Sequence, residues 1–242
     1  MTNLALIDAD LLVWLASYEK DYLYEAEEVI NFKLEEIITA TDCSHYKFFV
    51  GGRNNFRHFI KSDYKAHRTG DKPELFDATK QLFIEKYNAF VSNGVETDDS
   101  IVATAKYVKD NELYNPIVCT TDKDYKIKPL TLYSWERNFL GKVIEAKWTE
   151  VTEEEAWHNF CVMMLTGDAG DNIKVCKGIG KAKAAKILDG KTRQGMIRAI
   201  VNTYKMFYGE NWKYKLTETY HLINLIDDYT RVNVPKEYDF AI

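Results

Sequence analysis

Short apolar runs alternate with helical patterns through the first half of the 242-residue chain, and this alternation limits the fold more than any other feature. Four runs have the length and composition of buried strands: Leu4–Ile7, Tyr46–Val50, Ile117–Thr120 and Leu130–Trp135. Apolar residues recur at helical spacing between them, over Ala26–Ala40, Glu74–Val91 and Asp98–Val108, the last with Thr97 as the expected N-cap. This order predicts an α/β fold with a mostly parallel twisted sheet flanked by helices.

After Glu150 the pattern becomes purely helical, over Thr152–Leu165, Lys181–Leu188, Gly195–Phe207 and Leu216–Ile226. We therefore predict an α/β domain over residues 1–150 and an all-α region over residues 151–242. No run approaches the roughly 20 apolar residues that cross a membrane, and no basic region precedes the first strand, so we expect no signal peptide. The four cysteines lack CxxC spacing, which predicts reduced thiols in a cytosolic protein.

Acidic residues gather where the predicted elements begin and end. Asp8 follows the first strand, and the other seven form three groups: Glu96, Asp98 and Asp99; Asp122 and Asp124; Asp168 and Asp171. One acid alone reads as a helix cap or an ion-pair partner. Because ligands of parallel sheets bind at the carboxyl ends of the strands, we expect these acids to share one site.

Carboxylates that lie close together repel one another, and a bound divalent cation is the commonest way to neutralise this repulsion. A set of eight acids suits two metal ions about 4 Å apart, of the kind that hydrolyse phosphodiesters. Hard oxygen ligands favour Mg²⁺ or Mn²⁺ over zinc. The sequence thus predicts a two-metal site.

Positive charge is concentrated in two segments, although the formal net charge is -5. Residues 173–193 carry seven Lys/Arg against one acid, and residues 51–73 carry six against two. Residues 18–36 are acidic, with seven acids against two lysines, which reads as a solvated helix face. Phosphate binding depends on local patches, so the total charge does not exclude a DNA partner.

The sequence Gly178-Ile179-Gly180 predicts a tight hairpin between two helices, a helix-hairpin-helix over about residues 160–190. Glycines allow close backbone approach, and a helix start offers N–H groups to a phosphate oxygen. We expect Gly178, Gly180, Lys181 and Lys183 to grip the DNA backbone. The alternative is a glycine turn with a solvated lysine face.

A second basic segment mixes cations with aromatic residues, in Phe56-Arg57 and in Tyr64-Lys65-Ala66-His67-Arg68. We expect Lys65 and Arg68 to neutralise the scissile phosphate, Tyr64 to stack on the terminal base, and Arg57 to contact DNA. An exposed basic loop is the alternative. No serine or cysteine lies in a nucleophile elbow or beside a partner histidine, which argues against covalent catalysis.

The order of these motifs resembles the flap endonuclease/5'→3' exonuclease family, whose members are PIN-like (resolvase-like) metal-dependent nucleases. The resemblance covers residues 3–190 and rests on these segments: Ile7–Asp10, Tyr64–Arg68, Val95–Asp99, Thr121–Asp124, Gly167–Ile173 and the hairpin Gly178–Gly180. The short chain, without a polymerase domain, looks like the stand-alone, phage-type enzymes.

By this resemblance the chain hydrolyses DNA in replication or repair at 5' flaps, nicks or duplex ends, and it acts on RNA–DNA hybrids where primers are removed. It implies a cytoplasmic monomer of a bacterial or phage-infected cell, and K⁺ at the hairpin. It also divides the metal ligands: Asp8, Glu96, Asp98 and Asp122 at the first position, Asp124, Asp168 and Asp171 at the second, with Asp99 between.

Two departures from the family pattern stand out. The family places an aspartate after the second strand, where residues 50–52 offer none. Only 27 residues separate Arg68 from Glu96, so we expect one helix from Pro73 to Asn93 and a reduced arch over the site. A junction-binding protein that no longer cleaves and a PIN-like ribonuclease are the alternatives, and the hairpin disfavours the ribonuclease.

Overall fold

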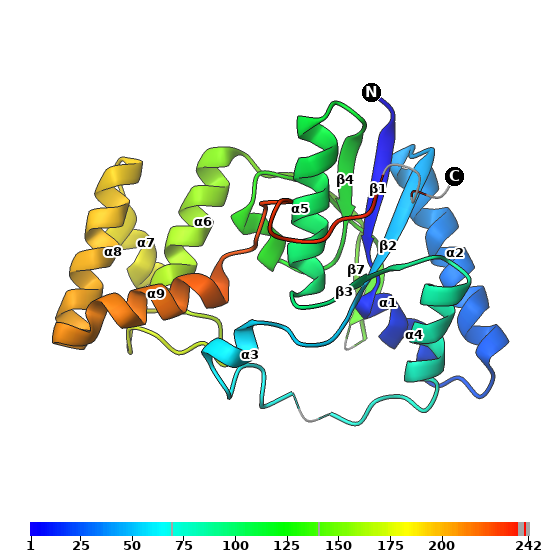
Figure 1. Ribbon diagram of the computed structural model, residues 1–242, viewed down its shortest axis with the longest axis horizontal. Coiled ribbons are helices and arrows are strands. Elements are labelled where there is room, and N and C mark those ends of the chain that lie inside the picture. Colours follow the sequence, from blue (N-terminus) through cyan, green and yellow to red (C-terminus); the bar gives the residue numbers. More distant parts are fainter. Residues whose placement is uncertain (69, 140, 237–239, 241–242) are drawn as a thin grey trace.

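A six-stranded sheet organises the computed structural model, which describes residues 1–68, 70–139, 141–236 and 240 (Figure 1). Its order is β3 (Phe90–Ser92), β2 (His45–Gly51), β1 (Asn3–Asp8), β4 (Asn115–Cys119), β5 (Thr131–Ser134) and β8 (Lys147–Glu150). The first five strands pair in parallel, and β8 pairs antiparallel with β5. The predicted mostly parallel sheet is confirmed.

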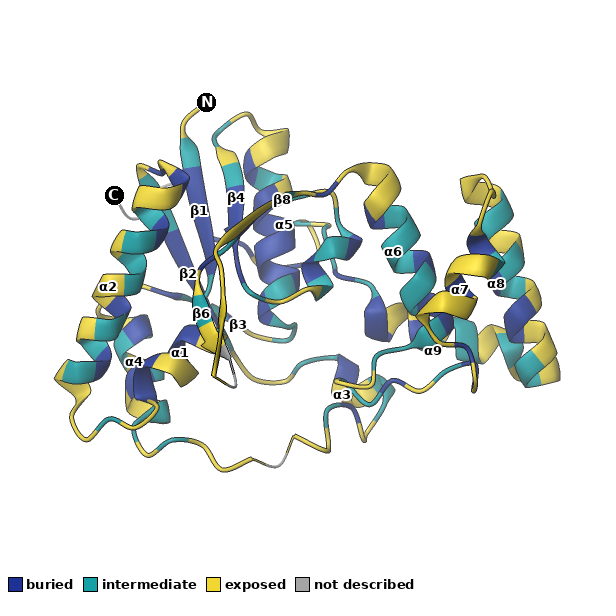
Figure 2. Ribbon diagram, turned by 180° about the vertical axis from the view of Figure 1, so that it is seen from behind, coloured by how far each residue is buried: buried dark blue, intermediate teal, exposed yellow. Residues whose placement is uncertain are grey.

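Helices cover both faces of this sheet. One face packs against α1 (Asp10–Ser17), α2 (Leu23–Thr41) and α4 (Phe76–Glu85), and the other packs against α5 (Thr97–Asp110). Residues of β1 alternate between the two cores, Leu4 and Leu6 in one and Ala5 and Ile7 in the other, and all four are fully buried. Figure 2 shows this buried sheet between the more exposed outer faces of the helices. Burial on both faces explains the continuous apolar strand sequences.

Beyond β8 the chain is helical, with α6 (Glu153–Thr166), α7 (Lys181–Leu188), α8 (Arg193–Tyr208) and α9 (Trp212–Ile223). We call residues 1–150 the sheet half and residues 151–223 the helical half. A C-terminal tail, residues 224–236 and 240, runs back along α5 towards β1, and its Val232 and Val234 pack on Ala103 (Figure 1). Division into two domains at residue 150 stays a prediction, and the tail is a segment beyond that point that lies against the sheet half.

The segment between Arg68 and Glu96 differs from expectation. Instead of one helix from Pro73 to Asn93, α4 ends at Glu85, and Phe90–Ser92 form β3 beside β2. Asn88 has φ +49, a left-handed conformation that helices do not continue through. Between α3 (Arg57–Ile60) and α4, residues 61–68 and 70–75 form no helix (Figure 1).

Other local differences are smaller. Glu96, not Thr97, is the N-cap of α5. No pattern in the sequence predicted α1, or the hairpin of β6 (Arg137–Phe139) and β7 (Lys142–Ile144). In the part of the chain that the structure describes, no helix has the length and hydropathy of a membrane span.

Candidate functional site

An open cavity of about 630 Å³ lies at the carboxyl ends of the parallel strands. Most of the predicted metal ligands line it, together with both predicted catalytic cations: Asp8, Glu96, Asp98, Asp122, Asp124, Asp171, Lys65 and Arg68. Asp168 lies in a small adjoining hollow that Asp124 and Asp171 also line. The fold therefore gathers acids from four separate segments at one place.

Hydrogen bonds fix the ends of β1 and β4 relative to each other. Asp8 Oδ2 accepts from the hydroxyls of Thr120, at 3.2 Å, and Tyr125, at 3.1 Å. Asp122 donates its backbone N–H to Thr120 Oγ1 at 3.1 Å, and its own carboxylate accepts from the N–H of Asp124 at 2.9 Å. The segment after β4 thus holds both its own acids, Asp122 and Asp124, and Asp8 at the end of β1.

Several of these carboxyl groups have raised pKa values. Desolvation and the charges of Asp10 and Asp122 raise the pKa of Asp8 to about 7. Desolvation, with Asp122 and Asp168, raises the pKa of Asp124 to about 7. Desolvation, Glu96 and Asp99 raise the pKa of Asp98 well above its usual range. The cluster therefore carries more negative charge than the neighbouring cations compensate.

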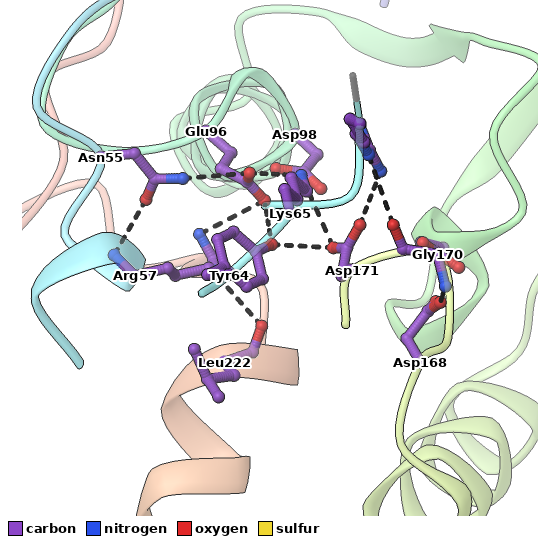
Figure 3. A network of polar contacts seen from close by, with 12 residues as sticks. Asn55, Arg57, Tyr64, Lys65, Glu96, Asp98, Asp168, Gly170, Asp171 and Leu222 are labelled. Atoms are coloured by element: carbon purple, nitrogen blue, oxygen red, sulfur yellow. Dashed lines mark hydrogen bonds and ion pairs between the residues drawn. The ribbon is translucent and has the colours of Figure 1, made fainter. Parts of the chain in front are cut away.

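Glu96 and Asp171 face each other across the basic segment (Figure 3). The Tyr64 hydroxyl lies 3.0 Å from Glu96 Oε2 and 2.8 Å from Asp171 Oδ2, so its single proton can serve one carboxylate at a time. Lys65 forms an ion pair with Glu96 and lies 3.5 Å from Asp171, and Arg68 contacts Asp171 at 2.6 Å. Both predicted phosphate-binding cations are thus bound to predicted metal ligands.

Two carboxylates of the cavity, Glu96 and Asp171, are thus already bound by cations. Among the described residues, no three His, Cys, Asp or Glu side chains stand close enough to hold a metal ion. Lys65 has φ +56 and donates its backbone N–H to the carbonyl of Asp171 at 3.1 Å. Such a left-handed conformation costs on the order of 1–2 kcal/mol and is concentrated at functional sites.

Three predicted site residues are corrected by the structure. Arg57 and Asp99 are 1% and 0% exposed and bind each other, so the one does not reach DNA and the other does not reach the cavity. Tyr64 is 1% exposed, and no base can stack on a ring that its neighbours cover. Its hydroxyl instead lies within hydrogen-bond distance of Glu96 and Asp171.

Asp10 lines the cavity and was absent from the predicted ligands. Its carboxylate accepts from the N–H of Gly51 at 2.9 Å and from the hydroxyl of Thr97 at 2.6 Å. A Cβ on Gly51 would lie 3.2 Å from Asp10 Oδ2, so this acid fills the space beside the strand end that lacks an aspartate. Its position two residues after Asp8 was the sequence feature that could have identified it as a site residue. Arg137, from the β6–β7 hairpin, also lines the cavity and had no sequence signal.

The glycine turn lies in the helical half, before α7. Gly178 has φ +82, which favours glycine, and a Cβ at Gly178 or Gly180 would meet nothing within 4 Å. Lys181 and Lys183 are exposed in the first turn of α7. The expected hairpin directly between two helices is wrong in one respect, because α6 ends at Thr166 and residues 167–180 intervene. The backbone of the turn is still accessible, and the exposed Lys181 and Lys183 lie directly after it.

Known proteins resemble this chain in sequence and in fold. No known family profile matches the chain. DNA polymerase I of Mycobacterium leprae (strain TN) is 29% identical over 183 residues, which cover 70% of this chain and 19% of the polymerase. The chain therefore spans a small part of that relative.

Solved structures match over nearly the whole chain. The D15 flap endonuclease of bacteriophage T5, co-crystallised with metal ions, has 15% identity and a TM-score of 0.56 over 92% of this chain and 100% of its own. The chain has the fold of the 5'-exonucleases and flap endonucleases. The catalytic core of Rad2 with DNA substrate (11%, TM-score 0.51, 95% and 74% of the two chains) shares it. Human GEN1 with Holliday junction DNA (15%, TM-score 0.52, 96% and 62%) does so too. The resemblance inferred from the motif order is confirmed at the level of this flap-endonuclease fold.

Proposed function

We propose that the chain is a divalent-metal-dependent nuclease that hydrolyses DNA phosphodiesters at 5' ends and flap junctions. The observation that carries the proposal is the single cavity in which acids from four segments meet Lys65 and Arg68. The match to part of a DNA polymerase I and the shared fold with T5 D15, Rad2 and GEN1 support it. We place its action in the cytoplasm of a bacterial or phage-infected cell.

The residues of the cavity fit a pair of hard divalent cations. Every donor is a carboxylate oxygen, the ligand that Mg²⁺ and Mn²⁺ prefer. Desolvation and, after it, repulsion between the acids raise the pKa values of Asp8 and Asp124, and cations would relieve the repulsion. The proposed ligands fall into two sets, Asp8, Asp10, Glu96, Asp98 and Asp122 for one ion, and Asp124, Asp168 and Asp171 for the other. Bound there, such ions supply hydroxide and stabilise charge on the phosphate.

The chain's own residues do the positioning. The Tyr64 hydroxyl and the Asn55 amide, which donates to Glu96 at 3.0 Å, orient the carboxylates between them. With metal ions held by Glu96 and Asp171, Lys65 and Arg68 would be free to contact a substrate phosphate, since both already line the cavity. Lys65 and Arg68 would therefore each have two alternative partners, a carboxylate when no metal is bound and a substrate phosphate when metal is bound.

DNA is the proposed partner of the helical half. Gly178, Gly180, Lys181 and Lys183 would contact the duplex backbone without reading its sequence, and K⁺ at the turn belongs to the same proposal. Mg²⁺ as the working metal, a monomeric protein, and RNA–DNA hybrids as further substrates are also part of the proposal.

The test is to incubate the protein with Mg²⁺ and end-labelled 5' flap, nicked-duplex, RNA–DNA and single-stranded RNA substrates. We expect cleavage of flaps and nicks that stops in excess EDTA and in the Asp122→Ala variant. Asp110→Ala, at the other end of α5 from Asp98, is the matched control and should cut like the wild type. Binding of flaps without cutting would indicate a junction-binding protein, and cutting confined to single-stranded RNA would indicate a ribonuclease.

A further inference from the structure

Arg57 and Asp99 form a buried ion pair that joins the two halves of the molecule. Arg57 Nη2 donates to Asp99 Oδ1 at 3.0 Å, and Arg57 Nη1 donates to the other carboxylate oxygen. The same guanidinium donates to the carbonyls of Leu222, at 3.1 Å, and Asn224, at 2.9 Å. Asp99 Oδ1 accepts from the N–H of Ile226 at 2.8 Å. Figure 3 shows Arg57 reaching from the site towards Leu222.

The pair connects helix ends of opposite polarity. Asp99 lies in the first turn of α5, where a negative charge is favourable, and its carboxylate also accepts from the N–H of Glu96 at 3.1 Å. Arg57 belongs to α3, but its guanidinium lies against the C-terminal end of α9, where a cation can take the hydrogen-bonding role of the missing N–H groups and donate to the last carbonyl groups. Burial acts to lower the pKa of Arg57, but the hydrogen bonds and charge of Asp99 outweigh it, so the pKa is raised. The guanidinium of Arg57 is therefore charged, and its Nε, Nη1 and Nη2 all donate hydrogen bonds.

Each side of the pair leads to one part of the proposed site. The first turn of α5 carries Glu96 and Asp98, and Arg57 Nη1 lies 3.7 Å from Glu96 Oε2. On the other side, Leu222 and Ile223 share one hydrophobic core with Ile179 of the glycine turn. Arg57 thus lies between an acid of the cavity, Glu96, and the end of α9, which packs into the same hydrophobic core as the glycine turn.

We propose that Arg57 and Asp99 are positioning residues that hold the cavity at a fixed distance from the glycine turn, and so determine which phosphodiester is cut. This inference rests on the proposed nuclease function. A duplex held by the turn enters the cavity at a place set by the spacing of the two halves. Loosening the pair then lets neighbouring phosphodiesters reach the acids in turn.

The test compares Arg57→Lys and Asp99→Asn with the wild type on one 5' flap substrate with Mg²⁺. Lysine keeps the charge but loses the planar fork that binds a carboxylate and two carbonyls together. We expect kcat to fall on the order of 10²-fold, as misplacement by 1 Å can cause, with KM for DNA changed less than about threefold because the turn is untouched. Products should spread to the adjacent nucleotides.

Lys128→Gln is the matched control. Lys128 forms a 2.9 Å ion pair with Asp227 and also joins the sheet half to the tail, but that pair is partly exposed and lies away from the cavity. We expect this variant to cut at the wild-type nucleotide with the wild-type kcat.

A second measurement separates positioning from stability. Amide hydrogen exchange should quicken together in residues 96–99 and 222–226 in either variant. Arg57→Met combined with Asp99→Leu replaces the pair by apolar groups, which restores much of the stability lost by breaking one partner. The double variant should regain thermal stability over Asp99→Asn yet keep the spread of cut positions.

The outcomes distinguish the two proposals. If the wild-type protein does not cut the flap, the proposed function fails, and this inference fails with it. If the wild type cuts but Arg57→Lys and the double variant cut at the same nucleotide with the same kcat, only the positioning role is overturned. Exchange that quickens in one segment alone would also overturn it.

Discussion

Asp98 and Asp99 are neighbours in the first turn of α5, yet they lie in two regions with opposite electrostatics. Asp98 lines the cavity, where desolvation, Glu96 and Asp99 raise its pKa. Asp99 is fully buried against Arg57. Successive helix positions point about 100° apart, so one faces the cavity and the other the core. The two residues are of the same type, so the bound Arg57 cation is what distinguishes the structural acid Asp99 from the candidate metal ligand Asp98.

The largest expected effect is on catalysis, at Asp98. We expect Asp98→Asn to lower single-turnover flap cleavage by about 10³-fold, because a metal ligand contributes several kcal/mol of charge stabilisation. The same change removes like-charge repulsion, so thermal stability in EDTA should rise. Cleavage by this variant at the wild-type rate would show that Asp98 is not a metal ligand.

The next effect is on stability, at Asp99. Asp99→Ala leaves Arg57 buried without its partner, and we expect a loss of about 3–5 kcal/mol in the free energy of unfolding. Denaturant unfolding measures it, with Asp110→Ala as the surface control, for which we expect a change within about 0.5 kcal/mol. A loss no larger than that of the control would show that the pair contributes little.

The raised pKa values in the cavity predict how the stability of the protein depends on pH. Asp8 and Asp124 titrate near pH 7 in the folded protein and near 3.8 when unfolded, so the folded state binds more protons between these values. Stability should therefore fall as pH rises through this window in EDTA, and Asp124→Asn should weaken the decline. Bound Mg²⁺ replaces the protons, and the decline should vanish in thermal melts with excess metal. A Tm in EDTA that rises with pH across the window would contradict the assignment.

The smallest effect concerns the glycine turn, a region without buried charge. Lys181→Met should weaken DNA binding and reduce the slope of log K against log salt by about 1, because one phosphate contact is lost. Cleavage at saturating protein should not change. Lys109→Met, at the C-terminal end of α5, is the control, and an equal effect there would show that the turn has no special role.

Sequence predicted the parts of this molecule that depend on local pattern. Apolar runs such as Leu4–Ile7 gave the strands, and the acids after them gave the cavity. The helix over Glu74–Val91 was overextended because Tyr87 and Phe90 continue its apolar stripe, whereas the left-handed Asn88 redirects the chain into β3.

Partners distant in sequence were beyond such reasoning. Arg57 binds a carbonyl 165 residues away, and Tyr64 contacts an aspartate 107 residues away. Nothing in the local pattern distinguishes a cation that meets DNA from one that meets a buried carboxylate. Asp10 was accessible to sequence reasoning by its spacing, but only the contact with Gly51 shows why it occupies the cavity.

The Arg57–Asp99 pair binds backbone groups that are far away in the sequence, and this separation bears on when the site forms during synthesis. During synthesis Arg57 and Asp99 leave the ribosome well before the backbone groups of Leu222 and Ile226, which lie 165 and 127 residues later. Until those groups arrive, Arg57 lacks its contact with the helical half and Asp99 lacks its contact with the tail, and such non-local contacts form late in folding. A partly synthesised chain would therefore carry the acids without their final arrangement, and the proposed activity would begin only after the tail has started to dock.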